Sequence, residues 1–93
     1  MTDENLFIVE EKVSRGKRKF NLKGRVTAVD ADILKAKLEN SINEGDNNII
    51  VNMENVSFLS SSGIKVFLII YKTAKSKGGS FFIEKPSDRK SVV

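Results

Sequence analysis

The stretch NIIVNMENVSFLSSSGI, residues 48–64, joins a candidate strand to a candidate helix. Ile49–Met53 is a short apolar run bounded by polar residues, which is typical of a strand buried in a parallel sheet. Three serines and Gly63 follow this run, and serine is among the best residues for starting a helix. We therefore expect a central strand whose carboxyl end leads directly into a helix. In α/β sheets this end of a strand usually carries the function.

An antiparallel hairpin and a helix are expected upstream of this strand. Leu6–Val13 and Lys19–Val26 are rich in branched and aromatic residues and flank a turn at Gly16, which predicts two paired strands. Beyond them the apolar residues recur at three- and four-residue steps, as an amphipathic helix requires. We expect Asp30 to be the N-cap of this helix and Gly45 to end it. The expected core positions of the helix are Ala31, Leu34, Leu38 and Ile42.

The downstream sequence completes an alternating pattern of strands and helices. A second helix is expected from Ser61 or Ser62 to about Lys77, and a strand from Ser80 to Glu84 follows. The expected fold is therefore α/β, with a single domain over residues 1–93 and the element order ββαβαβ. Its four-stranded sheet is mostly parallel with an N-terminal antiparallel hairpin. The helices are expected to be stacked on one side of the sheet, because parallel crossover connections are right-handed.

The composition excludes most catalytic and metal chemistry. The 93 residues contain no Cys and no His. Disulfide scaffolds, the common zinc, copper and iron sites, and Ser-His or Cys-His nucleophilic pairs are therefore ruled out. We expect a protein that is not an enzyme and that uses no cofactor and no metal.

The protein is expected to be cytoplasmic and not inserted in a membrane. Its first five residues are acidic rather than basic, and no apolar segment of a signal peptide follows them. The longest apolar run, Val66–Tyr71, has six residues, whereas a membrane-spanning helix needs about twenty.

The basic residues are concentrated near the hairpin. Sixteen Lys and Arg against twelve Asp and Glu give a formal net charge of +4, and residues 12–29 hold seven of these cations and no acid. Such a run fits a solvated turn and an edge strand protected by lysines. A nucleic-acid-binding protein would be more basic overall and would interleave aromatic residues with its charges. We expect no direct binding of nucleic acid.

The serines and the second helix form the candidate site. One serine suffices to cap a helix, so three serines in a row predict either a functional loop or simple capping. Projection of the helix at about 100° per residue gives a core face made of Ile64, Phe67, Leu68, Ile70, Tyr71 and Ala74. Two further apolar side chains fall outside this face beside two lysines. We expect a surface that binds an acidic protein partner, made of Ser60, Ser61, Ser62, Gly63, Lys65, Val66, Ile69 and Lys72.

These residues resemble a known family. Residues 22–24, the first helix, residues 48–64 and Gly78-Gly79 are similar to the STAS domain, and within it to the bacterial anti-sigma factor antagonists, also called anti-anti-sigma factors. The resemblance covers roughly residues 6–93 and is most specific at residues 50–64, which look like the family's strand, link and Asp-Ser-Ser-Gly phosphorylation motif. It implies a four-stranded sheet with helices on one side.

The resemblance also implies a switch. An unphosphorylated antagonist binds an anti-sigma factor that is a serine kinase, and phosphorylation by that kinase releases it. Position by position, Ser61 matches the phosphorylated serine, with Ser62 and Ser60 as less favoured acceptors, and Gly63 matches the motif glycine. Ser60 departs from the pattern because it stands where the family has Asp. The departure removes a carboxylate from beside the acceptor hydroxyl.

The C-terminal segment is a second departure from the family. Family members continue through a full third helix, whereas Pro86–Val93 offers about two turns, beginning at a proline that suits the first turn of a helix. We expect this shortened helix to leave apolar surface around Val92 and Val93. A partner, or a second copy in a homodimer, would then cover it.

Two other functions stay open on the sequence alone. The first is a STAS domain that does not switch and acts as an adaptor in a larger regulatory or transport assembly, which the serine at position 60 favours. The second is a module that binds a small ligand or nucleotide at the serine loop, which a helix N-terminus permits.

Overall fold

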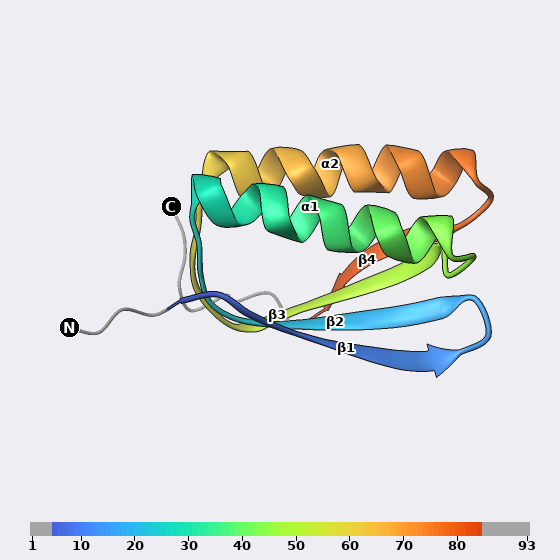
Figure 1. Cartoon of the computed structure of the whole chain (residues 1–93), viewed down its shortest axis with the longest axis horizontal. Coiled ribbons are helices and arrows are strands. Elements are labelled where there is room, and N and C mark those ends of the chain that lie inside the picture. Colours follow the sequence, from blue (N-terminus) through green and yellow to red (C-terminus); the bar gives the residue numbers. More distant parts are fainter. Residues whose placement is uncertain (1–4, 85–93) are drawn as a thin grey trace.

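A computed structural model describes residues 5–84 and confirms the expected order of strands and helices. The elements are β1 (Phe7–Ser14), β2 (Lys17–Val26), α1 (Ala28–Asn43), β3 (Asn48–Leu59), α2 (Ser61–Ser76) and β4 (Ser80–Glu84). They form one sheet in the order β1-β2-β3-β4, in which only the β1–β2 pair is antiparallel. Both helices lie over the same face of this sheet (Figure 1). The expected terminal helix at Pro86 and the apolar surface at Val92 and Val93 lie outside the described residues.

The hairpin forms where the turn signal predicts it. Gly16 adopts a φ of 74°, a left-handed conformation that glycine reaches without strain, and the chain reverses there between β1 and β2. The pairing register shifts between Lys12 and Ser14, so β1 carries an irregularity close to the turn. β2 lies between β1 and β3 and pairs in parallel with β3. This order places β1 at one edge of the sheet.

The start of α1 corrects the expected N-cap. Thr27, not Asp30, is the N-cap, and its hydroxyl accepts a hydrogen bond from the Asp30 backbone N–H at 3.3 Å. The Asp30 carboxylate accepts in return from the backbone N–H of Thr27, also at 3.3 Å. This reciprocal capping box satisfies two backbone N–H donors, whereas a single cap at Asp30 would satisfy one. The helix therefore begins at Ala28. At the other end Gly45, with a φ of 97°, turns the chain toward β3.

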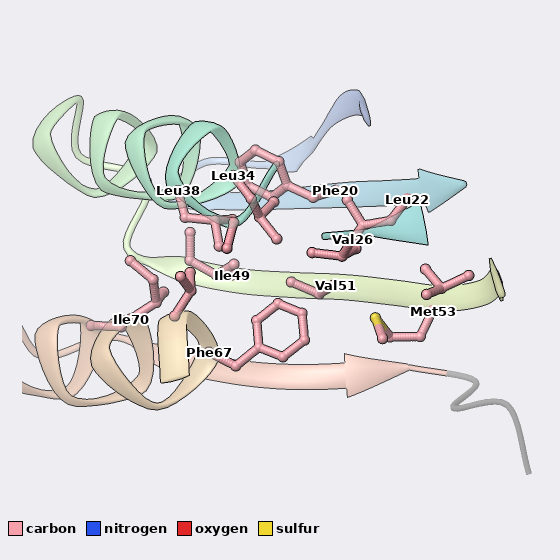
Figure 2. Close-up of a cluster of buried hydrophobic side chains, with 14 of the residues drawn as sticks. Phe20, Leu22, Val26, Leu34, Leu38, Ile49, Val51, Met53, Phe67 and Ile70 are labelled. Atoms are coloured by element: carbon pink, nitrogen blue, oxygen red, sulfur yellow. The ribbon is translucent and has the colours of Figure 1, made fainter. Parts of the chain in front are cut away.

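The core lies between the helices and the sheet (Figure 2). Alternate residues of β2 and β3 point toward the helices, as the two-residue period of a strand requires. Burial of each large apolar side chain contributes about 1.5–3 kcal/mol. The buried apolar residues are Phe20, Leu22, Val26, Ala31, Leu34, Leu38, Ile42, Ile49, Val51, Met53, Val56, Val66, Phe67, Ile70 and Ala74.

A buried carboxylate ties the hairpin to the turn between α1 and β3. Asp46 accepts hydrogen bonds from Lys12 Nζ at 2.8 Å and from Arg18 Nη2 at 2.6 Å. Arg18 also pairs with Glu44 at 2.8 Å and with Glu10 at 3.1 Å. These hydrogen bonds, the one from Lys12 most and the one from Arg18 next, lower the pKa of Asp46 from its ordinary value of 3.8. Two cations of the basic run are therefore already paired with acids of the fold.

Candidate functional site

The three serines lie where β3 passes into α2, and Ser60 is the N-cap of the helix. The Ser60 hydroxyl accepts a hydrogen bond from the Gly63 backbone N–H at 3.1 Å. The Ser60 backbone N–H donates to the carbonyl oxygen of Val26 at 2.9 Å, which fixes the loop to the end of β2. Ser60 therefore has a structural task at this position. A hydroxyl performs this capping task as well as a carboxylate does.

Gly63 is explained by packing rather than by chemistry. A Cβ atom at this position would lie 2.7 Å from Leu59 Cδ1 and 3.1 Å from Val26 Cγ1. Because Val26 is fully buried, it has little room to move. The first turn of α2 therefore sits directly against the ends of β2 and β3, and only glycine permits this approach without a shift.

Ser61 is the accessible hydroxyl of the three. It is the first residue of α2 and is exposed, whereas Ser62 is partly buried. Within residues 5–84 the hydroxyl of Ser61 has no hydrogen-bond partner, and the backbone N–H groups of Ser61 and Ser62 are unpaired, as is usual in the first turn of a helix. No acidic residue lies in this turn. The first turn itself therefore supplies no acid that would neutralise the partial positive charge of the helix N-terminus.

Of the four residues expected on the outer face of α2, three are exposed and one is buried. Lys65, Ile69 and Lys72 are exposed, as expected, but Val66 is buried in the core. Three of the six expected core residues, Phe67, Ile70 and Ala74, are buried. The other three expected core residues are exposed instead, and these are Ile64, Leu68 and Tyr71.

The correction has a physical cause in how α2 meets the sheet. The buried residues of α2 are Gly63, Val66, Phe67, Ile70 and Ala74. The four apolar residues follow Gly63 by three, four, seven and eleven positions. Residues with this spacing lie on one face of a helix. Gly63 has to face the sheet because no other side chain fits there, and this requirement turns the helix so that Val66 points inward. The glycine at the start of the helix was the signal that could have selected this face.

Two exposed stripes therefore run along α2. The first, which we call the Ser61 face, consists of Ser61, Lys65, Ile69 and Lys72. The second, which we call the β4-side stripe, consists of Ile64, Leu68 and Tyr71. The second stripe adjoins Phe67, whose ring is 5.7 Å from the ring of Phe81 in β4, so it lies on the side of α2 that is turned toward that strand. The Ser61 face joins the accessible hydroxyl to two lysines and one exposed apolar side chain.

Other kinds of site have little support in the described part of the chain. Residues 5–84 hold no group of three or more His, Cys, Asp or Glu side chains that could bind a metal ion. Within the same range, neither helix has the length and the apolar character that crossing a membrane requires.

The family follows from a match over most of the chain. The model of the STAS domain family matches residues 9–90. The chain belongs to the STAS domain family. A relative of this STAS domain is the anti-sigma-B factor antagonist of Bacillus subtilis (strain 168), which is 28% identical over 81 residues, or 87% of this chain and 73% of the relative.

Solved structures agree with the STAS fold. The anti-sigma factor antagonist SpoIIAA in its unphosphorylated form superposes with a TM-score of 0.79 at 27% identity, over 87% of this chain and 74% of that one. The phosphorylated form of the Bacillus cell fate determinant SpoIIAA gives a TM-score of 0.78 at 24% identity, over 89% of this chain and 76% of that one. The expected fold, a four-stranded mixed sheet with both helices on one side, is thereby confirmed.

Proposed function

We propose that this STAS domain is a cytoplasmic anti-sigma factor antagonist. In the proposal, the unphosphorylated chain binds an anti-sigma factor that is a serine kinase, and transfer of phosphate to Ser61 releases it. The observation that carries the proposal is the exposed Ser61 hydroxyl at the start of α2, in a chain similar to an anti-sigma-B factor antagonist. The chain acts in this scheme as a substrate and binding protein and not as an enzyme.

Ser61 is the best acceptor of the three serines on geometry. The Ser60 hydroxyl is engaged by the Gly63 N–H, and Ser62 is partly buried. A kinase has to reach the hydroxyl oxygen from solvent and align it with the phosphate of ATP. Ser61 meets this requirement without any change in the fold.

A phosphate on Ser61 is expected to leave the helix intact. The group adds about −1.5 to −2 charges at neutral pH. At Ser61 these charges lie beside unpaired backbone N–H groups and the positive end of the helix dipole, with no acid in the first turn to repel them. The release would therefore act at the interface, where charge and bulk appear at a contact point.

The partner surface of the proposal is the Ser61 face. Ile69 supplies an exposed apolar contact, and Lys65 and Lys72 supply positive charge on either side of it. No acidic residue lies between Glu54 and Glu84 in the sequence. This charge distribution favours an acidic surface on the partner. Val66 takes no part, because it is buried in the core.

The test is phosphorylation of the purified chain by its cognate anti-sigma kinase with ATP, followed by intact-mass measurement. We expect a single added phosphate, lost in Ser61→Ala and retained in the matched control Ser62→Ala. Ser61→Ala should still bind the kinase, and Ser61→Asp should bind at least about tenfold more weakly, because a carboxylate then occupies the contact point. The absence of phosphate on the unmodified chain would remove the switch from the proposal.

A second function is favoured by one residue. Ser60 stands where the antagonist pattern has Asp, and its hydroxyl satisfies the cap without supplying a charge beside Ser61. A STAS adaptor that binds its partner permanently would need only the cap. Binding to the anti-sigma factor without phosphorylation would support this adaptor. Restored phosphorylation in Ser60→Asp would then identify the missing carboxylate as the cause.

A further inference from the structure

The two edges of the sheet differ in how well they are protected. The β1 edge carries Glu10, Glu11 and Lys12 and a register irregularity close to its turn. Charges and irregularities of this kind are the usual means by which proteins prevent an edge strand from pairing with another chain. β4 pairs with β3 on one side, and within residues 5–84 no strand pairs with its other side. Its sequence, Ser-Phe-Phe-Ile-Glu, has no proline, no lysine and a single charge at its end.

Among residues 5–84, the outer edge of β4 has unpaired backbone groups in a definite pattern. The Ser80 N–H donates to the carbonyl oxygen of Asn47 at 3.1 Å, so Ser80 is directed toward β3. Because neighbouring residues of a strand direct their backbone groups to opposite sides, Phe81 and Ile83 direct theirs to the free edge. An antiparallel strand placed at this edge could form backbone hydrogen bonds with the N–H and C=O groups of both Phe81 and Ile83. A second β4 fits this pattern, with Phe81 opposite the Ile83 of the other copy and Phe82 on the two-fold axis.

The surroundings of the edge are apolar on both sides of the sheet. Phe82 lies on the open face, and Ile83 lies on the face covered by the helices, on the side toward which the β4-side stripe of α2 is turned. The side chains of Ile64, Leu68, Tyr71, Phe82 and Ile83 are between 44% and 61% exposed. At roughly 150–200 Å² for each side chain, they leave on the order of 450 Å² uncovered on one copy.

From this edge and its area we infer that the STAS domain associates with a second copy of itself through antiparallel pairing of β4. Two copies would bury at most about 900 Å² from these side chains, and the backbone edges bring the total to about 1,000 Å², the lower limit of a specific interface. An interface at this limit belongs to the weak, transient class. A two-fold pairing uses the β4 edge of both copies and is therefore closed at two, and the charges of β1 disfavour further pairing at the opposite edge.

The lysines of α2 give the association a distinctive salt dependence. Lys75 lies over the ring of Tyr71 at 5.8 Å, and each copy brings this cation toward the interface. Added salt screens the repulsion between the two copies, so association should strengthen about two- to threefold between low and high ionic strength. Binding to an acidic partner weakens under the same change. Association that weakens with salt would show that ion pairs hold the copies together and would overturn the inference.

Sedimentation equilibrium of the full chain, from about 10 µM to about 1 mM, tests the dimer directly. Phe82→Lys places two ammonium groups at the axis and should raise the dissociation constant at least about tenfold. Phe7→Lys is the matched control, because Phe7 is 59% exposed and Phe82 61%, and both lie on the open face of edge strands. We expect the control to dimerise like the unmodified chain.

A second pair of variants covers the case in which Phe82→Lys does not fold. Leu68→Lys, on the β4-side stripe, should weaken the dimer. Ile33→Lys on α1 is its matched control and should not, because the two residues are similarly exposed, at 54% for Leu68 and 52% for Ile33. Amide exchange at Phe81 and Ile83 should also slow as the protein concentration rises.

A chain that is monomeric at the highest concentration overturns the inference and leaves residues 85–93 or another protein to cover the edge. Equal loss of association in Phe7→Lys or Ile33→Lys would place the contact elsewhere. None of these outcomes depends on phosphorylation of Ser61.

Discussion

The orientation of α2 can be tested with two neighbouring apolar residues that the structure separates. Val66 is 5% exposed and belongs to the core, whereas Ile69 is 40% exposed on the Ser61 face. Replacing Val66 by alanine removes two buried carbon groups, at about 0.8 kcal/mol each, and adds the cost of the cavity left behind. The higher helix propensity of alanine returns about 0.5 kcal/mol. We expect Val66→Ala to lower the free energy of unfolding by about 1.5–2.5 kcal/mol.

For a domain of this size, such a loss lowers the thermal midpoint by about 8–13 °C. Ile69→Ala is the matched control, and it should shift the midpoint by only a few degrees, because substitutions at exposed positions usually change stability by less than about 0.5 kcal/mol. Thermal and urea unfolding followed by circular dichroism would measure both variants. A larger loss for Ile69→Ala than for Val66→Ala would mean that α2 is rotated, and it would refute the assignment of both exposed stripes.

Two further predictions concern the glycine and the buried carboxylate. Gly63→Ala should destabilise by about 1 kcal/mol in an unfolding titration, because overpacking against Leu59 costs about 1–3 kcal/mol and helix propensity returns about 1 kcal/mol; an increase in stability would show that Leu59 moves aside freely. The lowered pKa of Asp46 means that its stabilising contribution is complete above the ordinary value of 3.8 and is lost as the pH falls through the lower folded value. Asp46→Asn should therefore lose stability less steeply than the unmodified chain below about pH 4, and parallel acid-unfolding curves would contradict the pairing of this carboxylate with Lys12 and Arg18.

Most of the fold could be predicted because its signals are local. The turn at Gly16 and the apolar run Ile49–Met53 each identify an element without reference to distant residues. The same locality explains why β3 was expected to be shorter than it is. Glu54 and Asn55 interrupt the apolar pattern, but Asn55 still pairs with β2, and the strand continues to Leu59.

The candidate site was predicted less completely, because α2 is apolar on almost every side. From Ile64 to Tyr71 only Lys65 is polar, so periodicity alone fits several rotations of the helix. The choice among them is made by a contact between Gly63 and residues of two strands, which sequence spacing does not report. The start of α2 was expected at Ser61 or Ser62, and the helix begins at Ser61, because a run of serines is a local signal for a helix N-terminus.

The pairing of Asp46 with Lys12 and Arg18 has a practical consequence for shortened versions of the chain. The partners lie 34 and 28 residues away from the carboxylate, and one of them belongs to the first strand. A chain that begins after Ser14 would lose Lys12 and leave the buried carboxylate with Arg18 alone. Fusion tags and N-terminal boundaries should therefore be placed before Phe7, where β1 is left whole.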